Sequence, residues 1–459
     1  MKRGYITVFF ALIFMVLMSL VISLFMGIQI NAYKLKAESV YSVASNSVLG
    51  EYHKELLEKY DLFYVDTSYK RGIPDYHQVE NRMWDYIEKN WNVSPASVEI
   101  NQIVLATDNG GIPYRKQISS YMKDKIGMTY VKELSDLFKT VSKEGFLEKD
   151  SKAHNSWEKR WQEAMVKKQE IPEKTWKKIE KLYPIETAYS ARESFVLNQV
   201  LEDKSNVSKK SVNVTDCVSN RELIVGTGCE EELNLMDRIY FIAYLVEKFS
   251  CYTKETTDGV LNYELEYLLG DGGSDYENLS IVVNKLLAIR ETLNVTYLLS
   301  DSEKMSLIKE ISSALSALIA SPELSPVFEV LLIGLWSYAE SVNDIKILLR
   351  GGQVPLVKTK ENWATDLESG LSLEMTTKLL DEQERGMNYT QYLEMLLLVA
   401  DNEKITFKSM DLIEMNIREI AGNENFRMDG LAEDFLANLV FEIPQFGSYH
   451  IVRRFGYVM

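Results

Sequence analysis

One uninterrupted apolar segment dominates the start of the chain. No charged residue occurs from Tyr5 to Tyr33, and the centre of this stretch is almost wholly apolar. A helix needs about 20 apolar residues to cross the hydrocarbon core of a bilayer, so residues 5–33 are predicted to form a transmembrane helix. A cleaved secretory signal has a shorter apolar core, of about 7–15 residues, followed by small residues at the cleavage site. The longer core here favours an uncleaved anchor.

The charges beside this segment predict its orientation. Lys2 and Arg3 precede the segment, and basic residues stay on the cytoplasmic side of a membrane. We therefore expect residues 1–4 to be a cytosolic stub in a single-pass protein of the cell membrane, with the C-terminal domain extracytoplasmic. The next most apolar run, Val330–Ala339, is too short to span a bilayer and predicts a buried helix.

Beyond the span, the pattern predicts that the same helix continues. Residues 34–60 contain no proline and one glycine, Gly50. Apolar and small residues share one helical face in this stretch: Val40, Val43, Ala44, Ser47 and Val48. We expect one continuous helix over residues 5–60, about 80 Å long at 1.5 Å per residue. Its outer half would pack against the exported domain.

The rest of residues 34–125 is predicted to form a membrane-proximal region of helices and one strand. Alternation around Val98–Gln102 indicates a strand, and Asp108–Gly111 is a strong turn signal. Helices are predicted at residues 75–89 and 114–125, and a further helix at residues 131–143 lies at the start of the helical domain.

Residues 126–425 are predicted to form a large helical domain. Lys149–Lys181 is dense in Lys and Glu and contains three tryptophans, which fits either a charged helical arm or a linker. Further helices are expected at residues 234–250, 275–299, 301–321, 325–350, 389–400 and 403–420. Capping boxes are predicted at two helix starts, Ser274 with Glu277 and Ser300 with Glu303.

The tail of the chain changes to a strand pattern. Residues 435–443 and 448–458 predict two strands, and Pro444–Gly447 predicts the turn between them. An isolated hairpin is marginal in water, so residues 426–459 should pack on the membrane-proximal region. We expect the Val98 strand to extend their sheet and the Val40 face to cover it. The tail residues expected near that contact are Phe441, Ile443, Ile451 and Phe455.

These elements predict an α+β, mainly helical protein. A single N-terminal transmembrane helix extends into a pilin-like membrane-proximal domain with a small antiparallel sheet, and a large helical insertion interrupts that domain. The formal net charge of −16 repels phosphate backbones, so we expect no nucleic-acid partner, and membrane lipid is the expected one.

The cysteines and histidines offer few candidates for chemistry. Cys217 and Cys229 are close enough in sequence to close a small disulfide loop outside the cytoplasm, and three reduced thiols, including Cys251, are the equal alternative. The four histidines, His53, His77, His154 and His450, each lack another His or Cys at metal-ligand spacing. We predict no catalytic residue, cofactor or metal.

Three further motifs have simpler interpretations. Gly270–Asp275 suggests calcium but lacks the distal Glu of an EF-hand, so a loop ending in a helix N-cap is favoured. Gly351-Gly352-Gln353 matches the tripeptide of peptide release factors, and a helix C-cap explains it better. N-glycosylation sequons begin at Asn92, Asn206 and Asn213, and such triplets also arise by chance.

The residues Lys2 to Leu12, KRGYITVFFAL, resemble the start of TadE/TadG-like proteins of tight-adherence (Tad) pilus systems. The chain also looks like a Gram-positive domain-of-unknown-function family encoded beside such pilus genes. Its supporting segments are Glu51–Asp66, Leu261–Leu279, Leu335–Pro355 and Arg453–Tyr457. This resemblance implies a genomic context and pilus or pseudopilin-like partners, without an established activity.

One residue departs from the pattern that the resemblance implies. Type IV prepilins are cut after a glycine like Gly4, which would make Tyr5 the first mature residue, and they carry Glu at the fifth mature position. That position is Phe9 here. Without the carboxylate, a repeated major subunit would leave an N-terminal amine poorly compensated.

We therefore expect a non-enzymatic minor pilin-like component or assembly factor, with or without processing. An anchored ligand-binding protein or adhesin is the alternative, and an anchored hydrolase is a further one.

Overall fold

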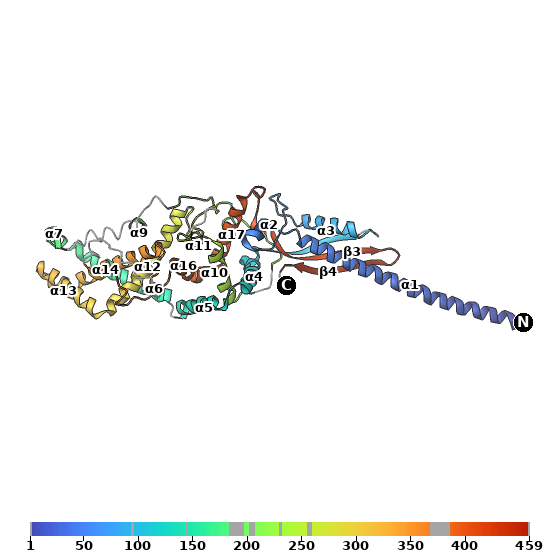
Figure 1. Ribbon diagram of the computed structural model, residues 1–459, viewed down its shortest axis with the longest axis horizontal. Coiled ribbons are helices and arrows are strands. Elements are labelled where there is room, and N and C mark those ends of the chain that lie inside the picture. Colours follow the sequence, from blue (N-terminus) through green and yellow to red (C-terminus); the bar gives the residue numbers. More distant parts are fainter. Residues whose placement is uncertain are drawn as a thin grey trace. The chain divides into compact units, whose positions relative to one another are not determined.

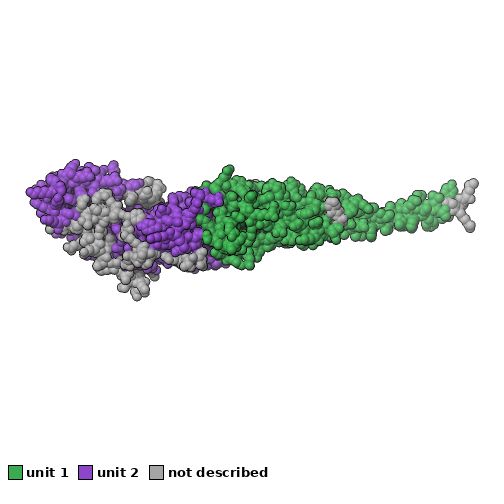
Figure 2. Space-filling view, turned by 90° about the horizontal axis from the view of Figure 1, so that it is seen from above, with its two compact units in different colours: residues 1–121, 217–233, 413–459 green, residues 122–216, 234–412 purple. Residues whose placement is uncertain are grey.

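A computed structural model of the chain describes residues 2–92, 96–143, 146–182, 197–201, 207–228, 232–254, 259–367 and 386–457. The chain forms two compact units (Figure 2). Unit 1 comprises residues 1–121, 217–233 and 413–459, and unit 2 comprises residues 122–216 and 234–412. These bounds differ from the expected helical domain, residues 126–425, because two stretches of that range, 217–233 and 413–425, belong to unit 1.

The first element is the helix α1, Lys2–Leu49, which contains the predicted span (Figure 1). Its apolar side chains from Tyr5 to Met26 are exposed. Within the described residues, this is the helix that is long and apolar enough to cross a membrane.

The expectation of one helix to Tyr60 is wrong, because the helix breaks after Leu49. The second helix, α2 (Lys54–Tyr60), begins at His53, whose ring nitrogen Nδ1 accepts a hydrogen bond from the Leu56 N–H. The His53 N–H itself donates to the Tyr64 carbonyl at 2.9 Å. Gly50 lowers the helix propensity here, and the His53 cap and the bond to Tyr64 replace the hydrogen bonds that a continuous helix would make.

The predicted elements before the insertion are present. Asp75 caps α3, Tyr76–Asn90, by accepting the His77 N–H. The strand around Val98 is confirmed as β2, Ala96–Leu105. The turn that follows is confirmed too, because Asn109, Gly110 and Gly111 have positive φ before α4, Asp108–Lys125, turns regular.

The sheet of unit 1 is antiparallel and centred on its longest strand. That strand is β3, Leu431–Ile443, which pairs with β1 (Val65–Asp66), β2 and β4 (Gly447–Gly456). A bulge lies in β2 between Ile100 and Gln102. The predicted hairpin and its pairing with the Val98 strand are therefore both confirmed.

The outer half of α1 covers this sheet, as predicted from the Val40 face (Figure 1). The buried α1 residues of this core are Ala37, Val40, Tyr41, Ala44 and Val48. They pack with the sheet residues Phe435, Phe441, Ile451 and Phe455 and with α3. Val43 was expected on this face but is 44% exposed, because its position is rotated away from the stripe that the buried residues form. Ile443 is also buried.

Unit 2 is helical in the residues described. Its helices are α5 (Met128–Lys143), α6 (Phe146–Gln169), α7 (Glu173–Leu182), α9 (Leu197–Val200), α10 (Leu235–Lys248), α11 (Glu264–Leu269), α12 (Asp275–Ser300), α13 (Ser302–Leu318), α14 (Ser325–Leu349) and α16 (Tyr389–Val399), with a short 3₁₀ turn at Pro322–Leu324. The helix α17, Asn402–Arg418, begins in unit 2 and ends in unit 1. A 3₁₀ turn at Met428–Gly430 precedes β3.

The charged segment Lys149–Lys181 is part of the folded core. Trp157 and Trp161 on α6 are buried in a cluster with α12, α13 and α14. The Trp161 ring packs directly on Gly334 of α14, where a Cβ atom would overlap the ring. Of the two alternatives, a helical arm or a linker, the helical one agrees with α6 and α7, but these helices pack into unit 2.

One predicted cap is confirmed in part and the other is replaced. The Ser274 hydroxyl accepts the Glu277 N–H, but the Glu277 carboxylate accepts from the Gly273 N–H instead of completing the box. Asp301, not Ser300, caps α13 by accepting the N–H groups of Glu303 and Lys304. The Ser300 hydroxyl is engaged with the Tyr297 carbonyl inside α12.

The contact between α1 and the sheet predicts how neighbouring substitutions behave. Ala44 is fully buried against the sheet. Adding volume to a filled core typically costs about 1–3 kcal/mol of unfolding free energy. We expect Ala44→Leu to accelerate amide hydrogen exchange of β2 and β3 in the detergent-solubilised protein.

Val43→Leu is the matched control for this test. It adds the same kind of side chain one residue away, on the exposed side of the helix, where substitutions change the unfolding free energy little. Equal acceleration of exchange by both substitutions would contradict the assigned helix face.

Candidate functional site

The three histidines whose side chains the structure describes lie in separate environments. His53 is a buried helix cap, His77 is exposed and lies 2.7 Å from the Glu80 carboxylate, and His450 is exposed next to Ser448. The side chain of His154 lies outside the described residues. Within the described part of the chain, no group of three or more His, Cys, Asp or Glu side chains is arranged to hold a metal ion.

A lysine binds oxygen atoms of the Gly270–Asp275 loop. The Lys408 ammonium donates to the carbonyls of Tyr267 and Gly270 and to the Asp271 carboxylate. The Asp275 carboxylate accepts the N–H groups of Asn262 and Tyr263. The loop oxygens are thus bound by groups of the protein, in agreement with the N-cap interpretation.

The Gly351-Gly352-Gln353 tripeptide ends α14. Gly351 has φ of 85°, and the Gly352 N–H donates to the Ile347 carbonyl at 2.9 Å. This is the helix C-cap that the glycine pair predicts. Of the sequon asparagines, Asn206 lies outside the described residues, Asn92 accepts from Lys36, and Asn213 accepts from Thr215.

The candidate processing and disulfide residues remain predictions. Gly4 lies within α1, and Tyr5 is exposed on the same helix. Cys217 and Cys251 are both buried. Cys229 lies outside the described residues, so the Cys217–Cys229 pair is untested.

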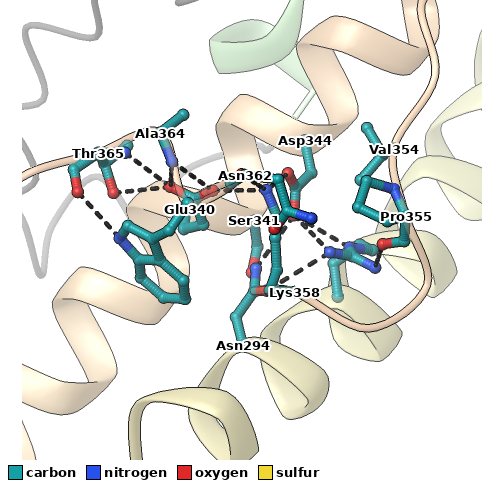
Figure 3. Close-up of polar contacts among 12 residues, drawn as sticks. Asn294, Glu340, Ser341, Asp344, Val354, Pro355, Lys358, Asn362, Ala364 and Thr365 are labelled. Carbon is teal, nitrogen blue, oxygen red and sulfur yellow. Dashed lines mark hydrogen bonds and ion pairs between the residues drawn. The ribbon is translucent and has the colours of Figure 1, made fainter. Parts of the chain in front are cut away.

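The segment Leu335–Pro355 contributes to a buried network of charges in unit 2 (Figure 3). Arg290 on α12 donates to the Asp344 carboxylate at 2.8 and 3.0 Å, and to the carbonyls of Pro355 and Leu356. The Tyr392 hydroxyl is also within 3.1 Å of its guanidinium. Every donor group of this arginine therefore faces protein.

A lysine joins two carboxylates of α14 in the same network. Lys358 is 2.6 Å from Glu340 and 2.7 Å from Asp344, and all three side chains are fully buried. Glu340 also accepts the N–H groups of Ala364 and Thr365 (Figure 3). Two cations and two anions thus compensate one another, and they fasten the loop after α14 to two helices.

Electrostatics within the network favour the charged forms. Burial alone raises the pKa of Asp344, but Arg290 and Lys358 outweigh it and the net pKa is lowered. Burial likewise opposes the charge of Arg290, and Asp344 raises its pKa overall. Charges that are buried and mutually neutralised favour one arrangement of the helices, because moving any one of them would leave its partner uncompensated.

Outside this network, unit 2 contains a buried glutamate whose pKa is raised toward neutrality. Glu266 on α11 is fully buried, and its carboxyl accepts the Tyr252 N–H and the Tyr389 hydroxyl on one oxygen. Burial raises the pKa of Glu266 to about 7. It belongs to the segment Leu261–Leu279, which the sequence resemblance had marked. Glu264 and Asp275 of this segment are also buried, whereas Asp271 and Glu277 are exposed.

One open groove of the described structure lies in unit 1. It has a volume of about 380 Å³. Its lining residues come from the loop between β1 and α3, from the start of α3, from β2 and from the segment 224–227: Thr67, Pro74, Asp75, Tyr76, Ile100, Asn101, Gln102, Ile103, Leu105, Ile224, Val225, Gly226 and Thr227. Asp75 already caps α3, so this lining suits binding rather than proton transfer.

Residues 217–228, here called the strap, form one wall of the groove. The Asp108 carboxylate accepts the N–H groups of Gly226 and Gly228, and Thr227 exchanges hydrogen bonds with the backbone of Ile103. Arg221 pairs with Asp429 at 2.6 Å and with Glu414. Sequence reasoning had treated this stretch as a possible disulfide loop within the helical domain. The residue that sequence reasoning missed is Asp108, which lies in the predicted turn and also accepts hydrogen bonds from the strap backbone.

The buried network predicts a strong effect of one lysine. Lys358→Met would leave Glu340 and Asp344 with Arg290 as their remaining cation. Removing one partner of a buried ion pair costs about 3–5 kcal/mol of unfolding free energy. We expect unfolding at a lower urea concentration, measured by tryptophan fluorescence. Trp336 and Trp363 are suitable probes, because both donate a hydrogen bond to the Thr365 carbonyl beside the network.

Lys360→Met is the matched control. Lys360 lies two residues away and pairs with Glu303, but both side chains are largely exposed. Exposed pairs contribute little, so the midpoint should not move. An unchanged midpoint for Lys358→Met would contradict the network's role.

Glu266 predicts a pH dependence of unit 2. Its carboxyl ionises near pH 4.5 in the unfolded chain and near pH 7 in the folded one, so between these values the folded state binds more protons. Stability from this group is therefore complete below pH 4.5 and falls as the pH rises to about 7. The loss is about 3 kcal/mol at 1.36 kcal/mol per pKa unit.

Glu266→Gln keeps the shape of the neutral acid and removes this titration. We expect the difference in urea midpoint between the variant and the unsubstituted protein to grow in the variant's favour from pH 5 to pH 8. Parallel pH profiles of the two proteins would show that Glu266 does not titrate in this range.

Comparison with known proteins gives a family for the chain. A model described as a family of unknown function (DUF5702) matches residues 174–443, which is more than half of the 459 residues. Searches of curated proteins and of solved structures gave no match. The matched range includes the Glu266 segment, the network of Arg290 and Asp344, the strap and β3. The chain belongs to the DUF5702 family.

Proposed function

We propose that the protein is a non-enzymatic, membrane-anchored extracytoplasmic component of a Tad-like pilus or a related surface assembly. It would act there as a minor pilin-like subunit or an assembly factor. The observation that carries this proposal is the two-part environment of α1. One helix has an exposed apolar half and an outer half that is buried as the core helix of unit 1.

The exposed half of α1 has the length and composition of a span. From Tyr5 to Ile28 it would extend about 36 Å at 1.5 Å per residue, which exceeds a hydrocarbon core of about 30 Å. Exposing this many apolar side chains to water is unfavourable, so a bilayer is the fitting surrounding. Lys2 and Arg3 favour a cytoplasmic N-terminus. A signal sequence with the same composition is the alternative for this helix alone.

The burial of the outer half favours an anchor over a removable signal. Val40, Tyr41 and Ala44 are core residues of unit 1. Because the helix is continuous through Leu49, the covered sheet and the apolar half are joined rigidly. Removing the helix with a signal peptide would expose one face of the sheet.

The assignment to a pilus rests on the resemblance of Lys2–Leu12 to TadE/TadG-like proteins. Phe9, in place of the prepilin glutamate, favours a minor or assembly role. The mutual pairing of the buried charges in unit 2 supports a non-enzymatic protein. The groove beside the strap favours a second candidate, an anchored ligand-binding protein or adhesin, because its lining is open and mixes apolar with amide and hydroxyl groups.

Topology and filament content together test the proposal. Val225 is 80% exposed on the strap, so Val225→Cys should react with a membrane-impermeant maleimide on intact cells freed of their wall. Quantitative mass spectrometry of sheared filaments should find the protein at a small fraction of the major subunit, because Phe9 lacks the compensating carboxylate.

An epitope placed before Lys2 is the control, and it should stay inaccessible until the cells are lysed. Labelling of the epitope with protection of the thiol at position 225 would reverse the orientation. Recovery of the protein as the dominant filament subunit would contradict the minor role. Its absence from filaments, together with unchanged pilus assembly in a deletion strain, would favour the ligand-binding alternative.

A further inference from the structure

The tip of the β3–β4 hairpin lies at the membrane-proximal end of unit 1. Both strands run alongside the outer half of α1 (Figure 1). The Tyr449 hydroxyl donates to Glu38 at 2.8 Å, and the Lys34 ammonium lies 5.5 Å from the Tyr449 ring centre. Further along β4, the ring of Phe455 meets that of Tyr41. β4 and α1 therefore run in the same direction, and earlier residues of β4 lie beside earlier residues of α1, closer to its apolar half.

The hairpin tip is three residues further in that direction. Phe446 precedes Tyr449 by about 10 Å at 3.3 Å per strand residue, which corresponds to roughly seven residues of α1. The tip thus lies near the level of Gln29 and Ile30. Burial agrees with this placement, because Ile30 and Tyr33 are half-buried while Leu35, on another face, is 72% exposed.

The level of Ile30 is where α1 would leave the bilayer. The segment from Tyr5 to Ile28 is longer than the hydrocarbon core, so the residues just beyond it fall among the lipid headgroups. The tip itself is suited to that layer. No charge occurs between Glu442 and His450, and this stretch carries Ile443, Pro444, Phe446 and Tyr449. Aromatic residues are enriched at this interface.

The tip is also a preformed shape. The Phe446 N–H donates to the Ile443 carbonyl at 3.0 Å, Gln445 has φ of 70°, and Gly447 has φ of 84°. Proline followed by a residue of positive φ is the arrangement of a type II turn. The turn fixes the backbone of Phe446, whose side chain is half-buried, so the residue needs little ordering to enter an interface.

We propose that the turn Pro444–Gly447 dips into the phospholipid headgroup layer beside α1, with Phe446 as its apolar contact. The Lys34 ammonium then faces the lipid phosphates from above. The bilayer would hold unit 1 at two points, the span and the turn, and so fix its tilt and rotation. This inference rests on the proposed membrane anchor and adds a second contact with the same lipid.

Spin labels on the full chain in nanodiscs of phosphatidylcholine and phosphatidylglycerol test the inference. Three variants are compared: Leu17→Cys in the span, Phe446→Cys in the turn, and Val452→Cys as the matched control. Val452 is 62% exposed on the same strand, β4. The unsubstituted protein, labelled in parallel, measures the background from its native thiols. Power saturation gives each label's ratio of accessibility to oxygen and to a water-soluble nickel chelate.

We expect the ratio at position 446 to shift from the value at 452 toward that at 17. Equal ratios at 446 and 452, with a high ratio at 17, overturn the headgroup contact and leave the anchor intact. A ratio at 17 as low as that at 452 overturns the anchor itself. A Phe446→Cys protein that lost its fold would be recognised by faster hydrogen exchange of β3, and the label is then moved to the exposed Gln445 as Gln445→Cys.

Discussion

The packing of α1 on the sheet is the contact on which unit 1 depends. Ala37 and Ala44 are fully buried residues of the helix, and they share one apolar core with Phe435, Phe441 and Phe455 of the strands. An α-helix is stiff along its length, because each turn is hydrogen-bonded to the next. The burial of its outer half therefore fixes the direction in which its exposed apolar half leaves the unit.

The sheet can be completed only when distant parts of the chain meet. β3 supplies the central strand from the C-terminal end, and β2 and α1 come from the first hundred or so residues. The family model covers β3 and the strap but neither β2 nor α1. The matched segment thus contains a central strand whose partner strand β2 and covering helix lie outside it, and it is not a self-sufficient domain.

Local signals in the sequence predicted what depends on local chemistry. The alternation around Val98, the Pro444 turn and the Ser325-Pro326 helix start all appear where expected. The structure differs from the prediction where a contact with another part of the chain determines the local conformation. His53 leaves the helix for the Tyr64 carbonyl, and Asp108 and the strap hold each other across more than a hundred residues. Arg290 and Lys358 look like ordinary surface charges until Asp344 is placed between them.

Each unit combines an apolar core with buried ion pairs, such as Arg221 with Asp429 in unit 1 and the network around Arg290 in unit 2. In unit 1, apolar contacts between a helix and a sheet tolerate a neighbouring bilayer, since lipid and core side chains are alike in polarity. In unit 2, Arg290, Lys358, Glu340 and Asp344 are stable only in one mutual arrangement, because each would be an uncompensated buried charge without the others. Such a network specifies one packing of α12 and α14 more strictly than apolar contacts do.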